Sequence, residues 1–268
     1  MLRPFAGRVD ETDWIALREV VPAATAPLRL RQDPDRAVLL STVLPLAWPA
    51  LVRSDGTVLL GLQQPARSGD VSRDLAAALE LALASEPGTP VPAVGPPEPG
   101  ARLQDLLDDA PIEVTVHAGF DYWLDGSSSE EGPSDEVAAS LERANATVVP
   151  TVRLSAVPAA YWCRMRERAH LRWVLPEDED AALDALARVG SAGGLAVGPD
   201  TRYVGAFRAH GLLVPVWDLP ADREAEALEE PVAALRARLD EALAQTAPLT
   251  TDERRARAGL TSRQLTLR

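Results

Sequence analysis

The sequence contains no lysine, although it carries 27 basic side chains in 268 residues, so every one of them is arginine. Lysine holds phosphate in Walker loops, forms Schiff bases with pyridoxal or aldolase substrates, and activates serine in some acyl-transfer enzymes. Protein kinases also need a strand lysine. The missing lysine therefore excludes all of these classes of enzyme.

Cysteine is almost as scarce, because Cys163 is the single thiol. One thiol cannot form an intramolecular disulfide, a four-cysteine zinc site or an iron–sulfur cluster. The three histidines stand at positions 117, 170 and 210, and no two of them have zinc-binding spacing. We therefore expect no metal, no cofactor and a reducing, cytoplasmic environment.

Long hydrophobic runs are also missing. The longest stretch without a charged residue covers residues 37–52 and contains Pro45 and Pro49, so it is too short and too broken to cross a bilayer. The first eight residues lack the apolar region of a signal peptide. A chain of this length with 46% hydrophobic residues nevertheless buries roughly three quarters of its unfolded surface. We expect a globular protein without a membrane partner.

The patterns that are present mix helices and strands, which predicts an α+β fold. Expected helices cover residues 12–21, 70–86, 102–109, 134–144, 159–168 and 177–189, and a further long helix contains Leu235, Leu239 and Leu243. Expected strands cover residues 27–31, 37–44, 51–53, 57–62, 112–117, 147–154, 170–175, 203–207 and 212–217. Asp55-Gly56 between two apolar arms is a hairpin signal.

Six prolines between residues 86 and 100 mark an exposed connection and the best candidate linker. We divide the chain into a first half (1–145) with a proline-rich loop (87–100), a second half (146–250) and an arginine-rich tail (251–268). The phrase that begins at Trp14 resembles the one that begins at Trp162. This similarity predicts an internal duplication, with two similar halves of helix, antiparallel sheet and helix.

Charge is distributed unevenly between the halves. Residues 1–145 hold 11 arginines and 23 acidic residues, a net charge of −12, whereas the rest of the chain is close to neutral at −1. Residues 103–142, which we call the acidic segment, contain eleven acidic residues and no arginine. Such a run is either a solvated face or a docking surface for a cationic partner, and it disfavours binding to a phosphate backbone.

Three residues of the acidic segment, Asp121, Trp123 and Asp125, are candidate binding residues. Together with Gly126 the two aspartates superficially resemble a calcium loop. A tryptophan stands at the third loop position, however, and Gly132 replaces the closing bidentate carboxylate. The sequence therefore predicts no calcium site.

His117 and Asp121 are four residues apart, a spacing that suits a general base and the carboxylate that orients it. No nucleophile is identifiable, because the sequence has no Gly-x-Ser-x-Gly motif. We expect a non-enzymatic binding or regulatory module that acts in protein–protein contacts. The alternative is a lysine-free, metal-independent hydrolase or transferase that uses His117 and Asp121.

The compact basic cluster outside the tail consists of Arg164, Arg166, Arg168 and Arg172, and three of these, Arg164, Arg168 and Arg172, are candidate binding residues. On the helix expected at residues 159–168, Arg164 and Arg168 share a face. This cluster has the charge to bind an anion, and pairing with the acidic segment of the same chain is the preferred interpretation.

Several phrases resemble an uncharacterised actinobacterial family, a domain of unknown function. They include ALREVVPAATAPL, VTVHAGFDYW, HLRWVLP and GAFRAHGLLVPVWDLP. The last phrase is also similar to one hairpin of the SseB-type module of secretion-associated proteins, an α+β unit. Neither resemblance implies a catalytic residue.

Overall fold

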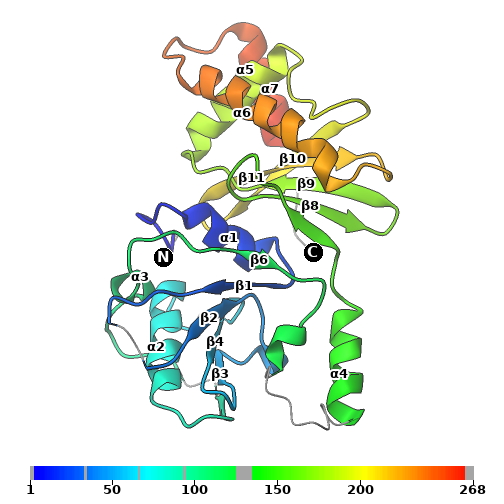
Figure 1. Ribbon diagram of the computed structural model, residues 1–268. Helices are drawn as coiled ribbons and strands as arrows, with labels where there is room; N and C mark the ends of the chain where they lie inside the picture. Colours follow the sequence, from blue (N-terminus) through cyan, green and yellow to red (C-terminus); the bar gives the residue numbers. More distant parts are fainter. Residues whose placement is uncertain (1–2, 33–34, 66, 93–94, 125–134, 263–268) are drawn as a thin grey trace. The chain divides into compact units, whose positions relative to one another are not determined.

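A computed structural model of the protein describes residues 3–32, 35–65, 67–92, 95–124 and 135–262 (Figure 1). The chain forms two compact units, Met1–Val148 and Val149–Arg268, which we call unit 1 and unit 2. Each unit combines a sheet with helices, so the predicted α+β class is confirmed. Within the described ranges, no helix is long and apolar enough to cross a membrane.

Unit 1 is built on a six-stranded sheet in the order β5-β3-β4-β2-β1-β6. Strands β2 and β4 run parallel, and the other neighbours run antiparallel. The strands are β1 (Ala24–Pro27), β2 (Val38–Ser41), β3 (Ala50–Val52), β4 (Val58–Gly61), β5 (Pro90–Val91) and β6 (Thr115–Val116). The helices are α1 (Glu11–Glu19), α2 (Val71–Leu83), α3 (Leu103–Leu106) and α4 (Asp135–Asn145), with short 3-10 turns η1 (Pro45–Ala47) and η2 (Asp121–Trp123).

Helix α2 follows directly from its sequence. The Asp70 side chain accepts a hydrogen bond from the backbone N–H of Ser72 at 3.1 Å, which caps the first turn. Leu75 and Leu79 are fully buried and lie one turn apart, on the side that packs against β3 and β4. This apolar stripe fixes the helix against the sheet, as the four-residue leucine spacing predicts.

The hairpin between β3 and β4 also forms where Asp55-Gly56 predicts it. The Asp55 carboxylate accepts from the N–H of Thr57 at 2.8 Å, and Gly56 has φ of +85°, a conformation that favours glycine. This turn brings Leu51 opposite Leu59 in the sheet.

The proline-rich stretch is not the linker that we expected. Pro90 and Val91 form β5, which pairs with β3, and Val91 is 1% exposed. Proline is tolerated there because β5 is an edge strand. Residues 86–100 thus belong to unit 1, and the chain divides after Val148.

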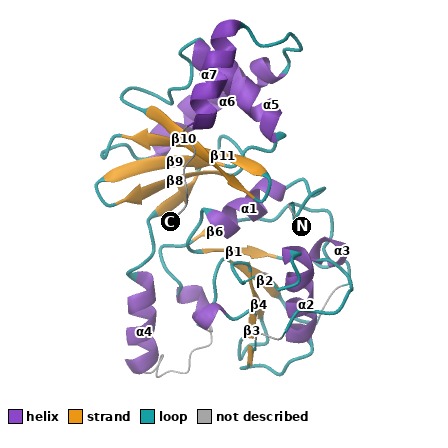
Figure 2. Cartoon of the chain, turned by 180° about the vertical axis from the view of Figure 1, so that it is seen from behind, coloured by secondary structure: helices purple, strands orange, loops and turns teal. Residues whose placement is uncertain are grey.

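Unit 2 has a fully antiparallel five-stranded sheet in the order β10-β11-β9-β8-β7. Its strands are β7 (Thr151–Arg153), β8 (Ala160–Met165), β9 (Arg168–Trp173), β10 (Arg202–Ala209) and β11 (Leu212–Leu219). Its helices are α5 (Glu179–Ser191), α6 (Glu229–Leu243) and α7 (Thr251–Ser262), with the 3-10 turn η3 (Ala225–Leu228). The three helices lie together on one face of the sheet (Figure 2), where Trp162, Trp173 and Trp217 join the core.

The helix predicted at residues 159–168 is wrong. This segment forms β8 and the turn into β9, with Trp162 opposite Leu171 and Cys163 opposite His170. Arginine, methionine and glutamate favour a helix locally, but aromatic Tyr161 and Trp162 gain more by packing on a pleated sheet. Tertiary packing therefore overrides local propensity.

This correction also removes the basis for an internal duplication. Trp14 lies in helix α1, whereas its sequence counterpart Trp162 lies in strand β8. The two sheets also have different strand orders, and only that of unit 1 contains a parallel pair of described strands. The structure does not support two duplicated halves.

Candidate functional site

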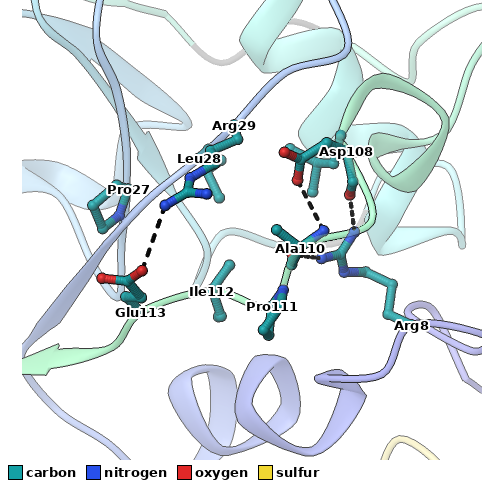
Figure 3. A pocket seen from close by; sticks show the side chains of 10 residues that line it. Arg8, Pro27, Leu28, Arg29, Asp108, Ala110, Pro111, Ile112 and Glu113 are labelled. Carbon is teal, nitrogen blue, oxygen red and sulfur yellow. Dashed lines mark hydrogen bonds and ion pairs between the residues drawn. The ribbon is translucent and has the colours of Figure 1, made fainter.

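A buried arginine, Arg8, anchors the acidic segment to the N-terminal part of unit 1 (Figure 3). Arg8 donates hydrogen bonds to the carbonyl oxygens of Asp108 (3.0 Å) and Ala110 (2.8 Å). Arg8 also forms a two-pronged ion pair with Asp10, whose carboxylate accepts from the N–H of Ile112 at 2.8 Å. The cavity beside these groups holds only about 40 Å³. This network is an anchor for residues 108–112 and has no room for a substrate.

Beyond the anchor, the acidic segment exposes its carboxylates. Glu113 pairs with Arg29 at 3.5 Å (Figure 3), Asp109 pairs with Arg31 at 2.8 Å, and both pairs are largely exposed. Further along the segment, four exposed carboxylates form no ion pair within the described part of the chain: Asp121, Asp135, Glu136 and Glu142. We call these four residues, Asp121 on η2 and the other three along α4, the acidic surface. Nearby, the N–H of Phe120 donates to Asn145 Oδ1 at 2.7 Å, which ties the start of η2 to the end of α4.

His117 does not pair with Asp121 as the spacing predicts. Its Nε2 lies 2.8 Å from Thr25 Oγ1, and its ring is tilted against that of Tyr122, with ring centres 4.8 Å apart. Partial burial lowers the pKa of His117, and the negative charge of Asp121 partly opposes this effect. Asp121 therefore acts on His117 through its field and not through a hydrogen bond between described atoms.

The aromatic residues around His117 hold the segment onto the sheet. Trp123 donates its indole N–H to the carbonyl oxygen of Val43 at 2.9 Å and stacks on Phe120 with ring centres 4.4 Å apart. The Tyr122 hydroxyl lies 3.4 Å from Thr42 Oγ1, and burial raises the pKa of Tyr122. Trp123 is thus a structural residue whose ring has a partner. Asp125 lies outside the described residues.

We expect stability to fall as the pH drops from about 7.5 to about 5.5. Burial lowers the pKa of both His117 and His170 in the folded protein, so the unfolded chain takes up these protons first. The stability that the two uncharged histidines contribute is therefore complete above their unfolded pKa near 6.5, and it is lost as the pH falls through their lower folded pKa values. Urea midpoints across this range measure the effect. In the double variant His117→Gln/His170→Gln the urea midpoint should change less with pH. An unchanged pH dependence would contradict the assignment of this effect to the two histidines.

The three candidate arginines of unit 2 do not form one patch. Arg164 in β8 pairs with Glu224 at 2.7 Å and lies over the Trp162 ring at 4.9 Å. Arg168 in β9 pairs with Asp218 at 3.3 Å, and Arg172 lies on the same side of β9 as Arg168. Successive side chains alternate across a strand, so Arg164 faces the helix side of the sheet and the other two face away. The prediction that Arg164 and Arg168 share one face of a helix was therefore wrong.

Sequence reasoning missed one row of reactive residue types that crosses the sheet of unit 2. Cys163, His170 and Asp218 are direct neighbours on β8, β9 and β11. His170 Nδ1 lies 3.1 Å from Asp218 Oδ1, and Arg168 and Arg202 reach the other oxygen of Asp218. No spacing in the sequence reveals this row, because only strand register creates it.

The order cysteine, histidine, aspartate matches that of a thiol triad, but the thiol is not activated. Cys163 is 1% exposed, and burial raises the pKa of its thiol. Reactive cysteines need an accessible thiolate. Among the described residues, no cluster of His, Cys, Asp and Glu is arranged to hold a metal ion. The row therefore has the character of a structural network.

Comparison with known proteins gives a family but no activity. A family model described as a family of unknown function (DUF5926) matches residues 4–268. Neither the curated proteins nor the solved structures contain a significant match to the chain. The family match covers nearly the whole chain, as the sequence resemblance implies.

Proposed function

The chain belongs to this family of unknown function, and we propose that it is a non-enzymatic binding module that recognises a basic protein partner through unit 1. The observation that carries the proposal is the acidic surface, where Asp121, Asp135, Glu136 and Glu142 stand exposed without an ion pair within the described residues. The negative charge of unit 1 attracts and orients a cationic partner over a Debye length of about 8 to 10 Å at physiological salt.

Pairing within unit 2 supports this choice over internal neutralisation by the basic cluster. Arg164 and Arg168 have carboxylate partners of their own, Glu224 and Asp218. A nucleic acid is a poor partner for the acidic surface, because like charges repel. The hydrolase alternative has less support. His117 is hydrogen-bonded to Thr25, and none of the four hollows described for the chain is lined by His117 and Asp121.

The test uses a fluorescent arginine-rich peptide of about 15 residues with leucines on one helical face. Its affinity for the full chain is compared with that for a variant that neutralises the acidic surface: Asp121→Asn, Asp135→Asn, Glu136→Gln and Glu142→Gln. We expect at least about tenfold weaker binding at 50 mM NaCl, and a smaller difference at 300 mM because salt screens the charges. Fluorescence anisotropy measures both affinities.

A matched control removes four exposed carboxylates from unit 2: Asp222→Asn, Glu226→Gln, Glu230→Gln and Glu241→Gln. This control has the same net charge as the test variant, so it separates a local surface from the total charge. Equal loss of affinity in both variants, or no binding to the unmodified chain, would reject the proposed function.

A further inference from the structure

A groove of about 500 Å³ lies within unit 1, between helix α2, helix α3 and the segment that follows β1. One wall is α2, with Leu79 and Leu83 one turn apart. The opposite wall is formed by Leu30 and Leu106. Leu79 is fully buried, whereas the other three leucines are partly exposed and line the opening. The groove therefore offers an apolar floor and apolar sides.

Backbone hydrogen bonds hold the second wall in place. Leu30 and Leu107 form an isolated antiparallel bridge, and the N–H of Arg31 donates to the carbonyl oxygen of Leu106 at 2.9 Å. The N–H of Asp108 in turn donates to the carbonyl oxygen of Arg29 at 2.9 Å. These backbone bonds hold Leu30 and Leu106 together in one wall of the groove.

The rim of the groove is acidic. Glu80 and Asp105 line it, and both are exposed. The one basic residue of the rim, Arg31, is paired with Asp109 at 2.8 Å. Glu80 lies 3.6 Å from Arg73, a long contact that leaves half of its side chain exposed. An apolar groove with an acidic rim is complementary to leucines flanked by basic residues.

We propose that this groove binds the apolar face of a basic amphipathic helix from the partner protein. Two leucines of such a helix, spaced by one turn, match the spacing of Leu79 and Leu83, and flanking arginines meet Glu80 and Asp105. The proposal rests on the proposed function, because it gives the same basic partner a second contact. Helices α2 and α3 lie on the opposite side of strands β2–β4 from α4 (Figure 1), so the groove and the acidic surface engage different segments of that partner. A groove of about 500 Å³ is large enough to take a pair of apolar side chains, which a contact between flat charged surfaces would not need.

The experiment compares the amphipathic peptide with a scrambled peptide of equal composition, whose leucines do not share a face. For the full chain we expect the amphipathic peptide to bind about tenfold tighter, which is about 1.4 kcal/mol. Leu83→Gln should abolish this preference, and Leu83→Met, which keeps an apolar side chain, should retain it. Leu106→Gln repeats the test from the opposite wall, so that one poorly folded variant does not decide the result.

Leu81→Gln is the matched control, because Leu81 is on the same helix, is 38% exposed and lines a separate hollow beside Pro92. It should leave the preference unchanged. If both peptides bind equally well and Leu83→Gln has no effect, the groove proposal fails while the acidic-surface proposal stands. If neither peptide binds, the proposed function itself fails.

Sedimentation of the protein alone tests a second occupant, another copy of this chain. A monomer, unchanged by Leu83→Gln, is the expected result. A dimer that Leu83→Gln dissociates would assign the groove to self-association and overturn the proposal.

Discussion

Replacing Arg8 with alanine is expected to lower the free energy of unfolding by about 3 to 5 kcal/mol. The side chains of Arg8 and Asp10 are only 7% and 2% exposed, and they form a two-pronged ion pair. Removal of Arg8 leaves a buried carboxylate without its counter-charge and frees the carbonyl oxygens of Asp108 and Ala110. Urea unfolding measures the loss, and hydrogen exchange at the N–H of Ile112 shows whether the anchor opens.

A second substitution at Arg8 separates the effect of the guanidinium geometry on stability from the effect of its charge. Arg8→Lys retains the charge but cannot make the forked contact with Asp10 or reach both carbonyl oxygens, so we expect it to remain clearly destabilised. Arg29→Ala is the control, since its pair with Glu113 is 67% and 80% exposed and should contribute about 0 to 1 kcal/mol. Similar losses for Arg8→Ala and Arg29→Ala would contradict the anchor.

Trp217→Ala is expected to cost unit 2 about 3 to 5 kcal/mol of stability. Trp217 is fully buried in the core beneath the helices, and its ring meets Tyr203 edge-on with centres 5.6 Å apart. Its indole N–H donates to the carbonyl oxygen of Leu195 at 2.7 Å. The substitution therefore creates a cavity and leaves a carbonyl group without its donor. Chemical unfolding followed by circular dichroism measures the change.

Trp217→Phe separates the two contributions. It keeps most of the ring packing but loses the donor to Leu195, so a loss of about 1 to 3 kcal/mol is expected. Val152→Ala is the surface control, because Val152 is 41% exposed on strand β7 at the edge of the same sheet. A Trp217→Ala effect no larger than that of Val152→Ala would show that the core does not depend on this ring.

The local elements of the fold follow from short-range chemistry. Asp70 caps α2 with its own side chain, and Asp55-Gly56 closes the hairpin between β3 and β4. Capping and turn formation depend on residues within a few positions of each other, so the sequence alone predicts them. The same is true of the charge imbalance, which depends on composition and needs no coordinates.

The candidate site was only partly predictable, because its contacts join distant positions. The acidic segment is visible in the sequence, but its anchor links Arg8 to residues 100 positions away, and no spacing rule reveals such a contact. His117 was predicted to pair with Asp121, but its hydrogen-bond partner is Thr25 on a neighbouring strand. Sheet pairing, not sequence distance, selected that partner.

By itself the sequence determined the α+β class, the helix capped by Asp70, the tight hairpin and the acidic character of the first half, because each depends on composition or on neighbouring residues. The tertiary structure alone decided that residues 160–165 form a strand, that Pro90 and Val91 join a sheet edge, and that Cys163, His170 and Asp218 form one row. The leucine groove was also decided by the tertiary structure, since Leu30 and Leu83 line one groove only after the chain has folded. Burial and strand register are cooperative properties of the whole chain, and they override local preference wherever the two disagree.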